Sequence, residues 1–94
     1  MQYLNGVTVA GEIVENEVSW KDFNETDKIA KFKLEIKDPT NEKATPVQMF
    51  VDLFLKKTAT FDGKKGDNVM LLGKLTQYKS YVNLQAHKAI VLKV

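Results

Sequence analysis

The 94-residue sequence contains no cysteine and no arginine, and its only histidine is His87. Without cysteine, the chain can form neither a disulfide nor a thiolate metal site. No segment approaches the roughly 20 apolar residues of a membrane-spanning helix, and the first residues lack the basic and apolar segments of a secretory signal. We therefore expect a cytoplasmic protein that holds no metal and no cofactor and does not enter a membrane.

The absence of arginine also bears on possible partners. All fourteen basic residues are lysines, and the twelve acidic residues leave a formal net charge of only +2. Arginine supplies the rigid fork that reads guanine edges, whereas lysine is a flexible point charge that attracts phosphate. If the chain binds a nucleic acid, its composition favours backbone contact over base-specific recognition.

The composition is that of an ordinary folded domain, with 44% hydrophobic and 28% charged residues. The length suits one domain over residues 1–94, and neither a repeat nor a linker interrupts it. Alternating apolar and polar residues predict five strands. Their ranges are Gly6–Ile13, Ile29–Lys37, Val47–Leu55, Val69–Leu75 and Tyr81–Leu92.

The segments between these ranges predict the connections. Lys56–Phe61 contains helix-compatible residues, and the following Asp62-Gly63 supplies a glycine C-cap, so we expect a short helix there. The polar segment Glu15–Lys28 predicts a loop or irregular hairpin, and Gln77–Ser80 a short hairpin connection. Three strands, a short helix and two strands form the order of an all-β, five-stranded OB-fold Greek-key barrel.

An OB barrel binds oligonucleotides on the face of its second and third strands, aided by two loops. Here the solvent side of the second strand carries lysines, and that of the third carries phenylalanines. Exposed rings stack on unpaired bases while lysines follow the phosphates, which is how sequence-tolerant single-strand binding works. The expected contact residues are the rings of Trp20, Phe50, Phe54 and Tyr78 and the lysines Lys31, Lys33, Lys37 and Lys56.

These residues also have structural interpretations. The lysine row alternates as any solvated strand face does, and Trp20 can equally pack over the barrel mouth. Phe50 and Phe54 are alternatively a subunit interface, because exposed aromatic pairs also drive oligomerisation. His87 has no motif around it, and no nucleophile accompanies the scattered carboxylates. We therefore expect a binding protein and not an enzyme.

Five segments, in the same order along the chain, resemble the bacterial-type single-stranded DNA-binding protein (SSB) family. They are Leu4–Ile13, Ala30–Ile36, Val51–Lys56, Lys64–Leu75 and Tyr81–Ala86, of which the fourth is the closest match. The resemblance implies single-stranded DNA as the ligand, a homodimer or homotetramer, and partners in DNA replication or recombination. It places Phe54 where the family has a base-stacking ring and puts Trp20 near another.

The sequence departs from that family in three places. Gln48 stands where some members have a stacking tryptophan, and the hairpin at Gln77–Ser80 is shorter than is common. The chain ends at Val94 without the family's glycine-rich linker and acidic tip. We therefore expect a short form of the SSB family, such as an accessory protein of a phage or other mobile element, or a primosome protein of the same fold. RNA as the ligand, and a protein-interaction module whose aromatics form an interface, are the alternatives.

Overall fold

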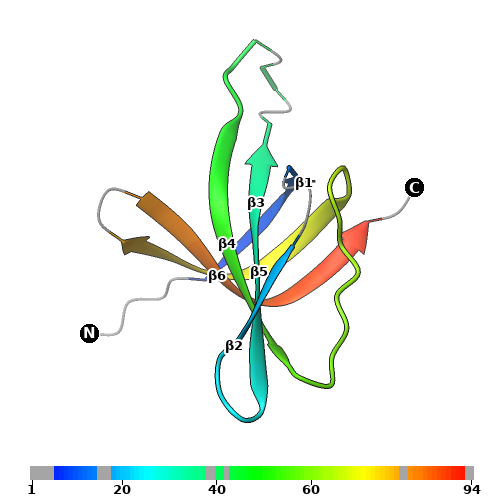
Figure 1. The fold of residues 1–94 in the computed structure, drawn as a ribbon. Helices are drawn as coiled ribbons and strands as arrows, with labels where there is room; N and C mark the ends of the chain where they lie inside the picture. Colours follow the sequence, from blue (N-terminus) through cyan, green and yellow to red (C-terminus); the bar gives the residue numbers. More distant parts are fainter. Residues whose placement is uncertain (1–5, 15–17, 38–39, 42, 79–80, 93–94) are drawn as a thin grey trace.

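The computed structural model describes residues 6–14, 18–37, 40–41, 43–78 and 81–92; for Tyr78 and Tyr81 it describes the backbone alone. Predictions that fall on residues 1–5, 15–17, 79–80 and 93–94 lie outside these ranges. The described part of the chain forms strands and no helix (Figure 1). The strands are β1 (Val7–Ile13), β2 (Ser19–Asp22), β3 (Asp27–Ile36), β4 (Val47–Lys56), β5 (Asn68–Tyr78) and β6 (Tyr81–Leu92). Nothing in these ranges is a helix of the length and apolarity that a membrane crossing needs.

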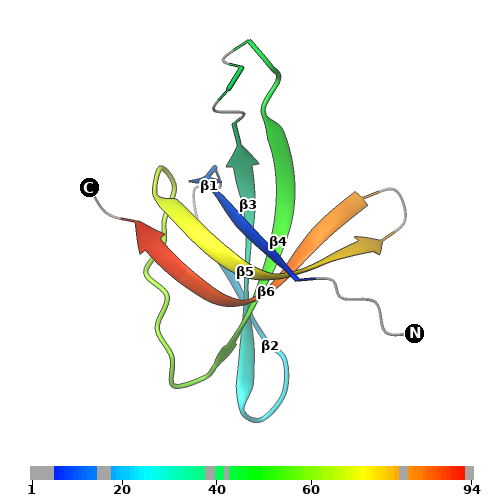
Figure 2. The ribbon, with the colours of Figure 1, turned by 180° about the vertical axis from the view of Figure 1, so that it is seen from behind.

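The strands make one sheet in the order β1-β5-β6-β4-β3-β2, and β1 returns to pair with β3, which closes a barrel. β4 and β6 are parallel, and the other neighbours are antiparallel. With β2 set aside, this is the strand order of an OB-fold. In both views, β3 and β4 cross the direction of β5 and β6 (Figures 1 and 2). At the closure, a Cβ on Gly11 would lie 2.5 Å from the carbonyl oxygen of Glu35, so only glycine permits this approach.

The barrel interior is built from the side chains that alternate inward. Ala30, Phe32 and Leu34 of β3 and Val51 and Leu53 of β4 are all buried, as their alternation predicted. Burying each large aliphatic or aromatic side chain contributes roughly 1.5–3 kcal/mol. The full core cluster is Ile13, Ala30, Phe32, Leu34, Val51, Leu53, Val69, Leu71, Leu84 and Ala86.

The predicted helix over Lys56–Phe61 is wrong. β4 continues to Lys56, and the chain then turns: the Ala59 N–H donates to the Lys56 carbonyl at 2.9 Å, and the Lys57 N–H donates to Thr26 at 2.8 Å. A first helical turn orders several residues for one hydrogen bond, and the β-branched threonines in this short segment favour that turn weakly. The segment is instead held by the neighbouring hairpin. Its last residue, Phe61, stacks on Phe32 with ring centroids 5.6 Å apart.

The expected count of five strands is also wrong, because the polar segment contains β2. All four β2 residues are exposed, so no apolar alternation marks this strand in the sequence. The hairpin tip that joins β2 to β3 is closed by Asn24, whose Oδ1 accepts the N–H groups of Thr26 at 2.9 Å and Asp27 at 2.7 Å. Such a side-chain turn is a common role of asparagine. β5 likewise extends to Tyr78, into the predicted connection at Gln77–Ser80.

Candidate nucleic-acid interface

Strand register determines which side chains share the outer face of the barrel. Residues directly opposite each other in an antiparallel ladder project to the same side. On β3 and β4 the outward pairs are Ile29 with Phe54, Lys31 with Asp52, and Lys33 with Phe50. We call this surface, together with the outward residues of β2 and β6 beside it, the outer face.

Phe50 presents its ring to solvent on the outer face. Its side chain is 46% exposed, and the ammonium group of Lys33 lies 5.2 Å from the ring centroid. That distance is within the range of a cation–π contact. An aromatic ring and a cation therefore stand together on the face that OB-folds use for oligonucleotides.

Phe54, one of the predicted stacking rings, is half-buried in an apolar cluster. The ring of Phe23 meets it edge-on, with centroids 5.3 Å apart and an interplanar angle of 77°. Ile29 lies opposite Phe54 in the ladder and is only 8% exposed, although it faces outward. We call Phe23, Ile29 and Phe54 the hairpin cluster, because the β2–β3 hairpin brings Phe23 to it.

Two of the lysines that were predicted to contact phosphates form ion pairs within the chain. Lys31 Nζ lies 3.4 Å from Asp52, and Lys56 Nζ lies 3.1 Å from Asp27. The hydrogen bond from Lys56 is the main cause that holds the pKa of the Asp27 carboxyl below its usual value, and Asn24 and Thr26 add to it. Both lysines remain exposed, and exposed ion pairs contribute little to stability. Each ammonium group can therefore exchange its carboxylate for a phosphate.

Two of the remaining predicted residues, Trp20 and Lys37, lie away from Phe50. Trp20 is opposite the buried Ala30, so it projects from the other side of the sheet, where Lys28 Nζ lies 4.7 Å from its ring centroid. Lys37 lines a separate hollow with Glu12 and Glu35. The structure describes the backbone of Tyr78, at the end of β5, but not its side chain. The structure thus brings Lys31, Lys33 and Phe50 together and separates Trp20 and Lys37 from them.

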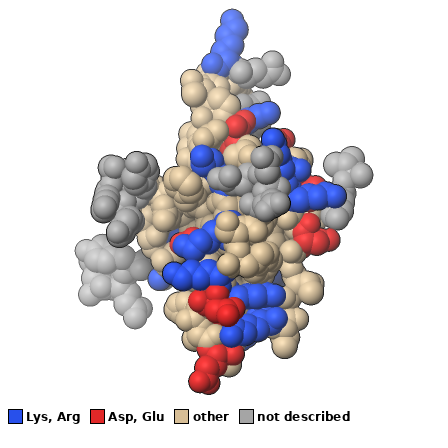
Figure 3. Space-filling model, viewed as in Figure 1, with Lys and Arg blue, Asp and Glu red and all other residues tan. Residues whose placement is uncertain are grey.

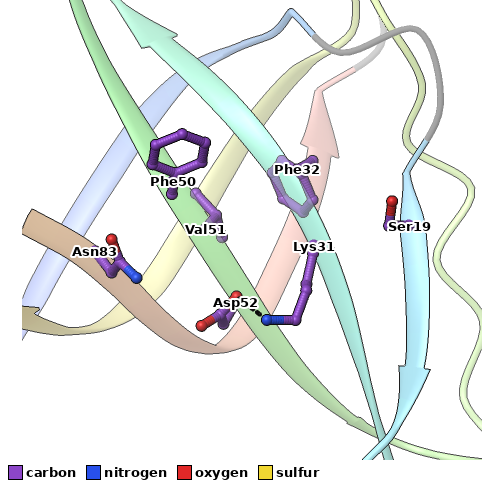
Figure 4. Close-up of a pocket in the computed structure, with 7 residues that line it drawn as sticks. All are labelled: Ser19, Lys31, Phe32, Phe50, Val51, Asp52 and Asn83. Atoms are coloured by element: carbon purple, nitrogen blue, oxygen red, sulfur yellow. Dashed lines mark ion pairs between the residues drawn. The ribbon is translucent and has the colours of Figure 1, made fainter. Parts of the chain in front are cut away.

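A hollow of about 320 Å³ opens beside Phe50, and we call it the Phe50 hollow. Four strands contribute to it: Ser19 from β2, Lys31 and Phe32 from β3, Phe50, Val51 and Asp52 from β4, and Asn83 from β6 (Figure 4). Asn83 was not predicted as a site residue. It lies level with Phe50 through the parallel pairing of β4 and β6, which no local sequence pattern reveals.

The face of the molecule seen in Figure 3 carries charges of both signs. Lysines and acidic side chains are interspersed in the view of Figure 3, and they do not gather into one basic patch. This distribution agrees with the net charge of +2. Any attraction to a polyanion is therefore local to the lysines of the outer face.

The strand order and the closure by β1 and β3 define a class of fold, the OB-fold barrel. Comparison with solved structures finds chains of the same fold. The N-terminal domain of PriB from Thermoanaerobacter tencongensis, described as dimeric, has a TM-score of 0.72 at 17% identity, covering 96% of this chain and 98% of that one. The SSB of Plasmodium falciparum, in complex with single-stranded DNA, has a TM-score of 0.69 at 18% identity, covering 99% and 98%.

A third similar structure is the SSB domain of a Synechococcus sp. protein, with a TM-score of 0.65 at 14% identity, covering 95% of this chain and 97% of that one. No protein-family model and no curated protein sequence matches the chain. The fold is that of SSB domains, and the resemblance drawn from the sequence is confirmed at this level.

Proposed function

We propose that this chain binds single-stranded DNA, with little dependence on sequence, on the outer face of β3 and β4. The observation that carries the proposal is the ring of Phe50, which is exposed on this face with Lys33 beside it. Base stacking on such a ring contributes about 1–3 kcal/mol per base and accepts every base, because each has a π face. The same fold in an SSB bound to single-stranded DNA supports the proposal.

In this mechanism, the DNA strand follows β4 from Phe50 towards the hairpin cluster. Phe50 and Phe54 are four residues apart on one strand, which corresponds to roughly 13 Å. Lys31, Lys33 and Lys56 border this route and would exchange their contacts for phosphates. Trp20, Lys37 and Tyr78 would contribute only where the DNA continues past this route. The proposed role is protection or presentation of single strands in replication or recombination, without catalysis.

The substitution Phe50→Ala tests the proposal. We expect it to weaken binding of a labelled oligo-dT by about 1–3 kcal/mol, measured by fluorescence anisotropy, while the circular dichroism spectrum is unchanged. The matched control is Val82→Ala, which truncates a comparably exposed apolar side chain (48%) on β6. Wild-type affinity in Phe50→Ala would remove this ring from the binding site. A competing RNA of the same length tests which sugar is preferred.

The hairpin cluster favours a second candidate, an interface between subunits or with a protein partner. Phe23 is exposed although it caps an apolar cluster, and exposed apolar groups of this kind often mark interfaces. A structural neighbour, the PriB domain, is described as dimeric. In this candidate, Phe23→Lys dissociates an oligomer, measured by light scattering, and leaves affinity for DNA unchanged. An unaltered mass together with weakened DNA binding would instead assign the cluster to the DNA site.

A further inference from the structure

A second hollow, of about 430 Å³, opens beside Phe54, and we call it the Phe54 hollow. β6 lies between β4 and β5 in the sheet, so the hollow has Phe54 of β4 on one side and Lys74 of β5 on the other. Gln85 and His87 of β6 complete its polar lining. Of these residues, only Phe54 belongs to the DNA route proposed above.

The strand register places the Phe54 hollow on the outer face. Lys74 lies opposite Gln85, which lies level with Asp52 in the parallel ladder. Asp52 in turn lies opposite Lys31, so all four side chains project to the same side of the sheet. The face that carries the proposed DNA route therefore continues across β6 to β5.

The ionisable groups at the Phe54 hollow are all basic. Lys74 contributes an ammonium group and His87 an imidazole, and no acidic residue is part of the lining that the structure describes. The Phe50 hollow, in contrast, includes Asp52, and the hollow at Lys37 includes two glutamates. Of these three hollows, the Phe54 hollow is the one whose charge suits an anion.

Lys74 also differs from two lysines of the proposed route. Lys31 and Lys56 pair with carboxylates, and each must leave its partner to bind a phosphate. Lys74 is exposed and forms no ion pair with any residue that the structure describes. A phosphate that binds Lys74 therefore displaces water and counterions without breaking a contact within the protein.

We propose that the Phe54 hollow is a second subsite for single-stranded DNA, in which one base contacts the rings of Phe54 and His87 and Lys74 binds the adjoining phosphate. The inference rests on the proposed function and extends the site from β3 and β4 to β5 and β6. Phe23 meets the Phe54 ring edge-on and does not line the hollow, so part of the ring remains to receive a base. Stacking accepts every base, so this subsite adds affinity without a base preference.

His87 reports on the Phe54 hollow, because it is the only histidine and its imidazole protons give NMR signals of their own. The full chain is titrated at constant pH and salt with an oligo-dT of about 12 nucleotides, within the range that an OB-fold covers. We expect the His87 signals to shift and to saturate at the dissociation constant measured by anisotropy. The backbone amide of Lys65, in the turn before β5, is the internal control and should not shift.

The variant Lys74→Gln tests the phosphate contact. We expect it to reduce the slope of log K against log salt by about 0.7, so that the loss of affinity is about fivefold larger at 0.1 M than at 1 M salt. Lys88→Gln is the matched control, because Lys88 is an exposed lysine of β6 that does not line the Phe54 hollow. It removes the same charge and should keep the wild-type slope.

The outcomes separate this inference from the function on which it rests. His87 signals that stay in place while anisotropy shows saturated binding would overturn the subsite and leave single-strand binding intact. A wild-type slope in Lys74→Gln, or equal losses in Lys74→Gln and Lys88→Gln, would overturn the role of Lys74. A lack of binding to oligo-dT in the wild type would overturn the proposed function and this inference together.

Discussion

Phe50 and Trp20 have almost the same exposed fraction, 46% and 45%, but they lie on opposite sides of the sheet. Exposure alone therefore does not make an aromatic residue part of a site. Phe50 gains its position from pairing with Lys33, whereas Trp20 pairs with the buried Ala30. At this scale, the partner across the ladder decides what each ring can contact.

The residue scale also yields a pH prediction for Asp27. Because the hydrogen bond from Lys56 lowers the pKa of this carboxyl, the pair's contribution to stability is present above the ordinary aspartate pKa and is lost as the pH falls through the lowered value. A carbon-13 NMR titration should give Asp27 a midpoint below that of an ordinary aspartate. Lys56→Gln should move the midpoint upward, and Lys57→Gln, at the neighbouring exposed lysine, should leave it unchanged. A midpoint that does not respond to Lys56→Gln would contradict the assigned cause.

Among the elements, the β5–β6 hairpin has the most demanding geometry. Its register shifts between Leu72 and Gly73, so that Leu72 pairs with Lys88 and Gly73 with Ala86, leaving His87 as the additional residue of a bulge. A Cβ on Gly73 would collide with the carbonyl oxygen of Gln85 and lie 2.6 Å from the Cα of Ala86. The bulge bends β6, the strand that carries Asn83 alongside β4.

Gly73→Ala should therefore destabilise the protein. Backbone atoms give way little, so we expect a loss of about 2–3 kcal/mol in the free energy of unfolding, measured by urea denaturation. Gly6→Ala is the control: no atom lies within 4 Å of the added Cβ, and its effect should stay within about 0.5 kcal/mol. Equal stability of the two variants would show that β5 and β6 separate more easily than this packing implies.

At the scale of the whole molecule, a net charge of +2 provides little long-range attraction, so binding must depend on local phosphate contacts. For single strands, log K falls with log salt by about 0.7 for each phosphate neutralised. The three lysines that border the proposed route, Lys31, Lys33 and Lys56, would together give a slope of roughly −2. A titration of oligo-dT across salt concentrations measures it.

Single substitutions show which lysines contribute to this slope of log K against log salt. Lys33→Gln should reduce the slope by about 0.7, whereas Lys65→Gln, in the turn before β5, should not change it. Lys31→Gln should have a larger effect on affinity than Lys33→Gln, because it also leaves the Asp52 carboxylate without its cation near the phosphates. Identical slopes in the wild type and Lys33→Gln would exclude this lysine from the phosphate track.

The sequence by itself determined the main strands and the inward side chains, because alternation with period two is a local property that each strand displays on its own. It also indicated Phe50 and Lys31 as exposed residues of the face that β3 and β4 share, whereas Phe54, expected there too, is half-buried. The tertiary structure alone decided that Lys56–Phe61 is not a helix, that β2 exists, that Trp20 projects away from Phe50, and that Asn83 lies beside it. These outcomes depend on register and on the parallel pairing of β4 with β6, which join residues far apart in the chain and therefore leave no local pattern.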